Sequence, residues 1–154
     1  MPQMIQFTQQ DMETAIRLIM AAFLGGLIGL ERESHGKDAG VRTYSLVSLS
    51  SALIMIVSVQ IYEVYKGSAG VDPSRIAAQV VSGIGFLGAG AIMREHGGSG
   101  IKGLTTAAGI WVASGIGLAC GMGLYHPAIL TTAFTLFILV FFSKVDRFFG
   151  GKDY

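Results

Sequence analysis

The sequence predicts an all-α polytopic membrane protein, a bundle of five transmembrane helices packed through glycine and alanine faces. Mean hydropathy is +0.57 and only 14% of the 154 residues are charged, whereas about a quarter are charged in soluble domains. Long runs contain no Asp, Glu, Lys or Arg, and the 22 glycines stand mostly among apolar residues. A bilayer crossing needs about 20 apolar residues, because the helix must satisfy every backbone amide without water.

The first helix is expected at residues 11–30 and has the least regular composition of the five. Glu13 and Arg17 precede its charge-free stretch, and Arg17 could extend toward the lipid headgroups. Thr8 and Asp11 have the spacing of a capping box. This spacing favours a helix that begins near Asp11 and includes both charged residues.

Charge-free runs and turn residues define the other helices. Asp72 and Pro73 suit the N-cap and first position of a helix, and the glycines and proline within 121–127 separate the last two crossings. The last helix is rich in Leu, Phe and Ile and has few small residues, so we expect it at the lipid-facing periphery. The expected helices are 43–62, 74–93, 103–121 and 125–143.

Small residues recur at helical spacing and predict close contacts between helices. Lipid tails supply no hydrophobic drive for helix association, so close backbone packing must hold the bundle together. The same faces could join two copies of the chain, and a dimer is the simplest homo-oligomer. The residues expected to form these faces are Gly25, Gly29, Gly85, Ala89, Gly109, Ala113, Gly117 and Gly121.

Lysine and arginine predict the orientation in the membrane. They concentrate in the first loop, the third loop and the tail at 144–154, and the opposite side has Lys66 and Arg75, with Arg17 near the start of the first helix. The positive-inside rule then places residues 1–10 outside and the C-terminus in the cytoplasm. Residues 1–10 lack the pattern of a cleaved signal, so we expect the first helix to be retained.

Ionisable residues at the ends of the first two helices are the first candidate polar site. Glu31 and Arg32 directly follow the first helix, and Arg42 begins the second. An ionisable group in a membrane is costly and often functional, and opposite charges could meet here at the cytoplasmic mouth. The alternative is a solvated ion-pair cluster of little energetic weight.

Further polar candidates lie in the third and fourth helices. Arg75 and Gln79 are one turn apart and share a helix face, while hydroxyl side chains in spans often bond their own backbone instead of lining a path. The complete set of candidates is Glu31, Arg32, Arg42, Asp72, Arg75, Gln79, Thr105 and Thr106.

Several classes of function find no support in these residues. The net charge of +1 provides no field for nucleic acid. His35, His96 and His126 fall in separate expected loops, so no metal site, cofactor or catalytic activity is expected. The segments 83–88 and 98–103 match a dinucleotide-binding glycine pattern but lack the strand and the acidic residue that the pattern requires.

Four segments resemble the MgtC/SapB family of bacterial inner-membrane proteins. They are Gly-Leu-Glu-Arg-Glu at 29–33, Ala-Gly-Val-Arg-Thr at 39–43, the stretch 72–92 and the stretch 103–111. The resemblance implies a five-helix membrane domain and a role in magnesium homeostasis. The chain ends soon after the fifth helix, so we expect a short form without the soluble C-terminal domain of longer members.

Two modes of action remain open under this resemblance. No acidic residue lies in the middle of an expected span, although a Mg²⁺ pathway would be expected to offer oxygen ligands. We therefore expect regulation of another membrane protein complex. The alternative is an oligomeric Mg²⁺ transporter or channel.

Overall fold

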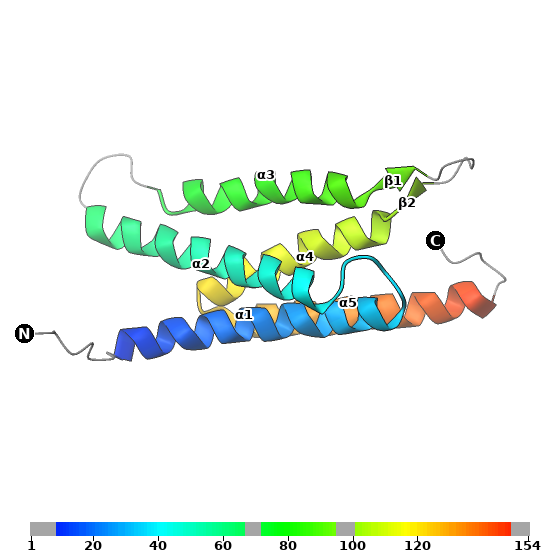
Figure 1. The fold of residues 1–154 in the computed structure, drawn as a ribbon. Helices are drawn as coiled ribbons and strands as arrows, with labels where there is room; N and C mark the ends of the chain where they lie inside the picture. Colours follow the sequence, from blue (N-terminus) through cyan, green and yellow to red (C-terminus); the bar gives the residue numbers. More distant parts are fainter. Residues whose placement is uncertain (1–8, 67–71, 95–100, 149–154) are drawn as a thin grey trace, which may run out of the picture.

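Five helices and one short hairpin make up the part of the chain that the computed structural model describes, residues 9–66, 72–94 and 101–148. The helices run alternately in opposite directions, and the first and last described residues lie at opposite ends of the bundle (Figure 1). The elements are α1 (Gln9–Ser34), α2 (Val41–Tyr65), α3 (Ser74–Ala91), β1 (Met93–Arg94), β2 (Ile101–Lys102), α4 (Leu104–Gly121) and α5 (Tyr125–Phe148).

Four of these helices, α1, α2, α4 and α5, are long and apolar enough to cross a membrane. The chain is therefore a multi-pass helical membrane protein. Helix α3 is not among the four. It has 18 residues, as α4 does, but Arg75 and Gln79 make it less apolar. It nevertheless lies alongside α2 and α4 and contacts both (Figure 1).

Glycines in the left-handed region shape the connections between helices. Gly36, with φ of 64°, ends α1, where the N–H of Lys37 donates to the carbonyl of Arg32 at 3.1 Å. Gly103, with φ of 88°, precedes α4, and a Cβ there would collide with the Ala91 carbonyl. Helix α3 ends at Ala91, short of the expected residue 93, because Met93 pairs with Lys102 in the hairpin.

The tightest packing places α2 against α1 on one side and α4 on the other. A Cβ added at Gly25 would lie 2.6 Å from the Tyr44 carbonyl oxygen, and one at Gly29 would lie 2.6 Å from the Val41 Cα. From α4, a Cβ at Gly121 would lie 2.5 Å from the Ala52 carbonyl oxygen. Real Cβ atoms do not approach so closely, so glycine is required where these backbones cross.

Helix α3 does not pack through the residues that the sequence suggested. Gly85 and Ala89 are exposed, and a Cβ at Gly85 would meet nothing within 4 Å. The buried residues of α3 are Ala77, Val80 and Ile84. Each residue turns a helix by about 100°, so Gly85, one residue after the buried Ile84, points in a different direction. The expectation that Gly85 and Ala89 pack against another helix of the same chain is therefore wrong.

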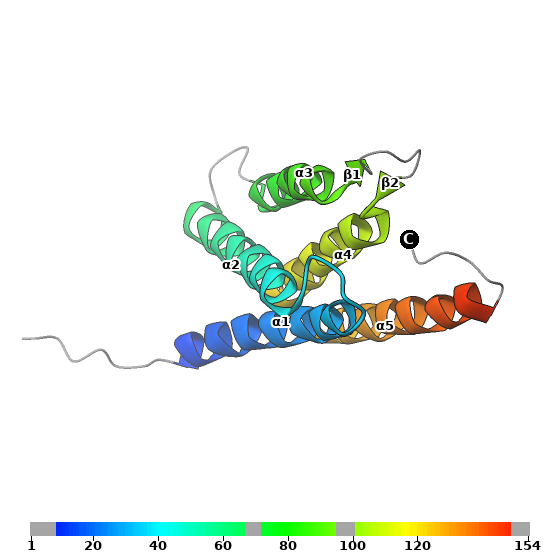
Figure 2. The ribbon, with the colours of Figure 1, turned by 45° about the vertical axis from the view of Figure 1, so that its right-hand side comes forward.

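Helix α5 lies at the edge of the bundle and is largely exposed. Figure 2 shows it extending away from the crossing of α1, α2 and α4. Its exposed side chains include Phe134, Phe137, Phe141 and Phe142. Apolar side chains of this kind suit contact with lipid.

Replacing Gly117 by leucine is expected to destabilise the bundle. The new Cβ would lie 2.8 Å from the Ser51 Cβ and still closer to the Ser48 carbonyl oxygen. Overpacking of this kind costs about 1–3 kcal/mol or more, and thermal unfolding in detergent should show it as a lower melting temperature. Gly115→Leu is the control, because a Cβ at Gly115 meets nothing within 4 Å. Equal melting temperatures for the two variants would contradict the tight crossing.

Candidate functional site

A buried ion pair lies at the end of α1. The side chains of Glu31 and Arg32 are only 7% and 5% exposed, and Arg32 Nε is 3.0 Å from Glu31 Oε2. This contact lacks hydrogen-bond geometry, so both carboxylate oxygens and Nε have no hydrogen-bond partner within the described residues. The two charges therefore compensate each other mainly by their proximity. Two buried charges held in this way depend strongly on each other.

His35 joins this pair from the next turn of the chain. Its Nδ1 lies 3.1 Å from Glu31 Oε1 and 2.8 Å from the Glu31 carbonyl oxygen. The carbonyl oxygen can only accept a hydrogen bond, so Nδ1 is assigned the hydrogen in the neutral ring. From the sequence alone, His35 is expected to be an isolated loop residue. The four-residue spacing from Glu31 is the signal that could have identified the contact.

Tyr44 connects the ion-pair region to α4. Its hydroxyl donates to the Thr106 carbonyl oxygen at 3.2 Å, and the side chain is fully buried. Arg32 and Glu31 both lie within electrostatic range of this side chain. Polar groups of α1, α2 and α4 thus meet in one region, where Gly109 leaves room for the tyrosine ring.

The buried serines of α2 follow different bonding patterns. Ser51 donates to the Val47 carbonyl of its own helix at 2.8 Å, and Ser58 donates to the Pro73 carbonyl at the start of α3. Ser48 Oγ is buried without a hydrogen-bond partner among the described residues. The bond from Ser51 agrees with the expectation that such hydroxyls satisfy their own helix.

A cavity of about 310 Å³ lies beside this region, between the α1–α2 loop and the helices α2, α3 and α4. Its polar lining comes from Asp38, Thr43 and Thr106. Three of the four segments that resemble the MgtC/SapB family contribute to its walls, namely 39–43, 72–92 and 103–111. The neighbouring Thr105 is exposed and does not line the cavity.

Arg42 does not join the buried pair. Its side chain is exposed, and it forms no ion pair with the described residues. Glu33 instead occupies the start of α2, where its Oε2 accepts the Val41 N–H at 2.9 Å. The expected meeting of Arg42 with the Glu31–Arg32 pair is therefore wrong, because Arg42 lies on the outer face of α2 whereas the pair is buried.

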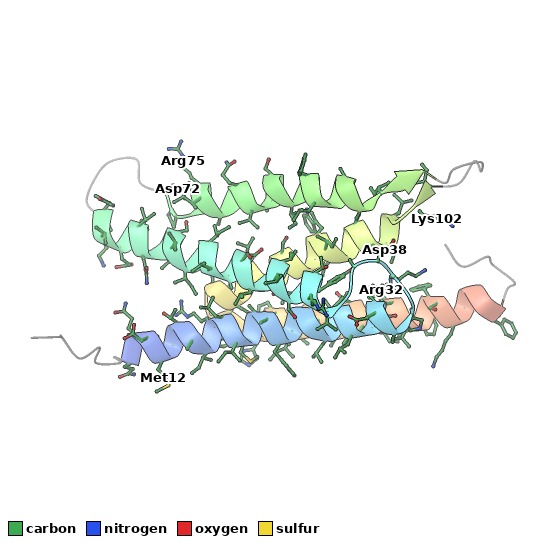
Figure 3. The ribbon with its side chains drawn as sticks, viewed as in Figure 1. Met12, Arg32, Asp38, Asp72, Arg75 and Lys102 are labelled. Atoms are coloured by element: carbon green, nitrogen blue, oxygen red, sulfur yellow. The ribbon has the colours of Figure 1, made fainter. Side chains whose placement is uncertain are left out.

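Asp72 and Arg75 lie at the opposite end of the bundle from Arg32 (Figure 3). Asp72 Oδ1 accepts the Ser74 N–H at 2.8 Å, and this bond to the backbone holds the pKa of the Asp72 carboxyl below its usual value. Arg75 is exposed and points away from the bundle (Figure 3). Gln79 alone of the candidates on α3 lines a groove, which it shares with α2.

Arg17 has a role that the sequence analysis did not identify. Its Nη1 donates to the Gly121 carbonyl at 2.9 Å, and Nη2 lies 4.0 Å from Glu13 Oε2. A cation at the C-terminus of a helix satisfies an unpaired carbonyl and interacts favourably with the helix dipole. Arg17 therefore clamps α1 to the end of α4.

Comparison with known proteins identifies the family. Residues 18–148, most of the chain, match the MgtC family. This chain belongs to the MgtC family. No solved structure matches it.

Several relatives of this MgtC family protein are bacterial. It is 46% identical over 144 residues to Escherichia coli (strain K12) YhiD, whose name proposes a magnesium transporter, and the match covers 92% of this chain and 66% of YhiD. It is 37% identical to Protein SrpB of Synechococcus elongatus, over 86% of this chain and 76% of SrpB. It is 46% identical to Protein MgtC of Salmonella typhimurium (strain LT2), over 62% of this chain and 38% of MgtC. The chain thus spans less than two thirds of YhiD and MgtC.

Removing one member of the buried pair is expected to cost more than removing an exposed arginine. Arg32→Ala leaves the Glu31 carboxylate buried without its partner, which typically costs about 3–5 kcal/mol. Thermal unfolding in detergent should show a large loss for Arg32→Ala and little change for the control Arg42→Ala. The double variant Glu31→Gln/Arg32→Met should recover much of the loss, because it removes both charges. Equal melting temperatures for the two single variants would show that the pair has no energetic weight.

Proposed function

We propose that this MgtC family protein acts in magnesium homeostasis in the bacterial inner membrane by regulating another membrane protein, without catalytic activity and without binding nucleic acid. Membership of the MgtC family and the similarity to YhiD support the link to magnesium. One contact supports regulation over conduction. Among the described residues, Glu31 is the one acidic residue whose side chain is buried. Its carboxylate lies in contact with Arg32 and His35.

A magnesium pathway would need different chemistry at this position. Mg²⁺ requires near-octahedral oxygen ligands and loses its water reluctantly. A carboxylate that lies 3.0 Å from a guanidinium is already compensated, and the positive charge of Arg32 repels a cation. The Glu31 region is therefore better suited to hold helices in one arrangement than to pass a divalent ion.

The second candidate function is an oligomeric Mg²⁺ transporter or channel. The 310 Å³ cavity supports it, because Asp38, Thr43 and Thr106 offer oxygen atoms of the kind that Mg²⁺ prefers. The outer face of α3 also favours self-association, since a Cβ at Gly85 would meet nothing within 4 Å and this position would admit a close neighbour from another chain. A dimer is the simplest such assembly.

The proposed topology has five crossings, with α3 as the fifth and residues 1–10 outside. Helix α3 supports this topology because it runs beside α2 and α4 and joins loops at opposite ends of the bundle (Figure 1). The α1–α2 loop and the β1–β2 hairpin lie at the same end, with Arg32, Asp38 and Lys102 (Figure 3). The positive-inside rule places this end, with the C-terminus, in the cytoplasm.

Cysteine labelling should test the topology. The single native cysteine, Cys120, is buried, so it is first replaced by alanine. A membrane-impermeant thiol reagent applied to intact cells should then label Ser74→Cys, at the proposed outer end of α3, and leave Lys102→Cys, in the strand that follows α3, unlabelled until the membrane is opened. The reverse pattern would invert the topology, and labelling of both positions in intact cells would contradict a crossing by α3.

Flux measurements should separate the two functions. Purified full-length protein in proteoliposomes is expected to show no Mg²⁺ uptake above empty vesicles, because the buried carboxylate is already paired with Arg32. Mg²⁺ uptake read by an internal fluorescent indicator, and lost in Asp38→Asn or Thr106→Val, would establish the transporter and exclude the regulator. The control is Thr105→Val, at the exposed neighbouring position.

A further inference from the structure

The inner face of α3 borders two cavities that join end to end. The larger cavity, of about 540 Å³, lies between α2 and α3, and the smaller is the 310 Å³ cavity described above. Val47 and Leu87 line both, which places them at the junction. The two cavities therefore form one path along α3 from Ile76 to Ala91, a length of about 22 Å at 1.5 Å per residue.

The two halves of the path differ in chemistry. The larger cavity is lined almost entirely by apolar side chains, with Gln79, Ser50 and Ser51 as its few polar members. The smaller cavity ends at the carboxylate of Asp38 and the hydroxyls of Thr43 and Thr106, on the side assigned to the cytoplasm. Asp38 is exposed and lies in no ion pair with the described residues. A molecule that fits both halves must be apolar along most of its length and carry hydrogen-bond donors at one end.

The chemistry and length of the larger cavity favour one kind of occupant. It extends along α3 from Ile76 to Leu87, about 16 Å, between mostly apolar side chains of α2 and α3. A single hydrocarbon chain from the surrounding bilayer matches an apolar groove of this length, since one leaflet contributes about 15 Å of hydrocarbon.

We propose that this path binds one acyl chain of a cytoplasmic-leaflet lipid whose headgroup carries a primary amine. The three N–H donors of the ammonium group suit the carboxylate of Asp38 and the oxygens of Thr43 and Thr106. One leaflet contributes about 15 Å of hydrocarbon, so a chain anchored beside Asp38 passes Val47 and Leu87 and ends near Gly83. The chain occupies the part of the space between α2 and α3 that lies next to the smaller cavity, and the bilayer itself supplies the ligand.

Photolabelling tests this site in the full-length protein. Vesicles contain the protein and a trace of lipid with a diazirine on its acyl chain and an ethanolamine, choline or glycerol headgroup. Mass spectrometry then measures the adducts on the peptides of α2 and α3. The ethanolamine lipid is expected to label these peptides about two- to fivefold more than either other lipid, the size of effect that an exposed ion pair gives.

Matched variants locate the chain and the headgroup. Gly83 lines the path and a Cβ there meets nothing within 4 Å, whereas Gly85 is equally open but lines neither cavity. Gly83→Phe should lower the labelling by all three lipids severalfold, and Gly85→Phe should leave it at the wild-type level. Asp38→Asn should keep the labelling but remove the preference for ethanolamine.

Three results would overturn the proposal. Equal labelling of Gly83→Phe and Gly85→Phe would show that the path is not the binding site. Equal labelling by all three lipids in the wild-type protein would exclude recognition of the amine. If Gly83→Phe changed the oligomeric mass in sedimentation without changing the labelling, a second copy of the chain would occupy the groove in place of a lipid.

Discussion

The backbone of α2 lies in close contact with glycines of α1 and of α4, and the other features of the structure depend on this double crossing. Gly25 and Gly29 bring α1 onto α2, and Gly117 and Gly121 bring α4 onto the same helix. In a bilayer the surrounding lipid is as apolar as the side chains, so helices gain from dispersion and close approach and not from leaving water. Three helices held this closely form a rigid centre. Helices α3 and α5 can then take positions with much more exposed surface.

The same close approach explains why charged groups can be buried at the end of α1. Tyr44, held between Gly25 and Gly109, bonds the Thr106 carbonyl and lies within electrostatic range of Glu31 and Arg32. The pair has few hydrogen bonds to support it, so its cost in free energy must be offset by the packing around it. Arg17 has a corresponding role at the other end, where it joins α1 to the terminal carbonyl of α4. Polar contacts thus hold α1 against its neighbours at both ends, and glycines allow the close packing between α1, α2 and α4.

Helix α3 gives the protein its accessible internal surface. Only three of its residues are buried, and cavities border its inner face from Ile76 to Ala91. A helix with Arg75, Gln79 and many glycines gains less from lipid contact than α1, α2, α4 or α5 does. The regions that respond to ligands are commonly those with the fewest buried contacts. The transporter alternative and the proposed lipid site therefore both place their chemistry along α3 and beside Asp38.

The sequence alone determined the helical membrane class and the family, because both follow from local patterns of hydropathy and from contiguous motifs. It also identified Glu31, Arg32 and Thr106 as candidates, and the structure places all three in the buried region shared by α1, α2 and α4. It could not determine which face of each helix points inward, since a pattern of small residues occurs on inner and outer faces alike. For this reason Gly85 and Ala89 were assigned to the wrong contact, Arg42 was placed in a pair that it does not join, and the contacts of Arg17 and His35 were missed. Only the tertiary structure decided these points, because each depends on the rotation of one helix against another, which no short stretch of sequence specifies.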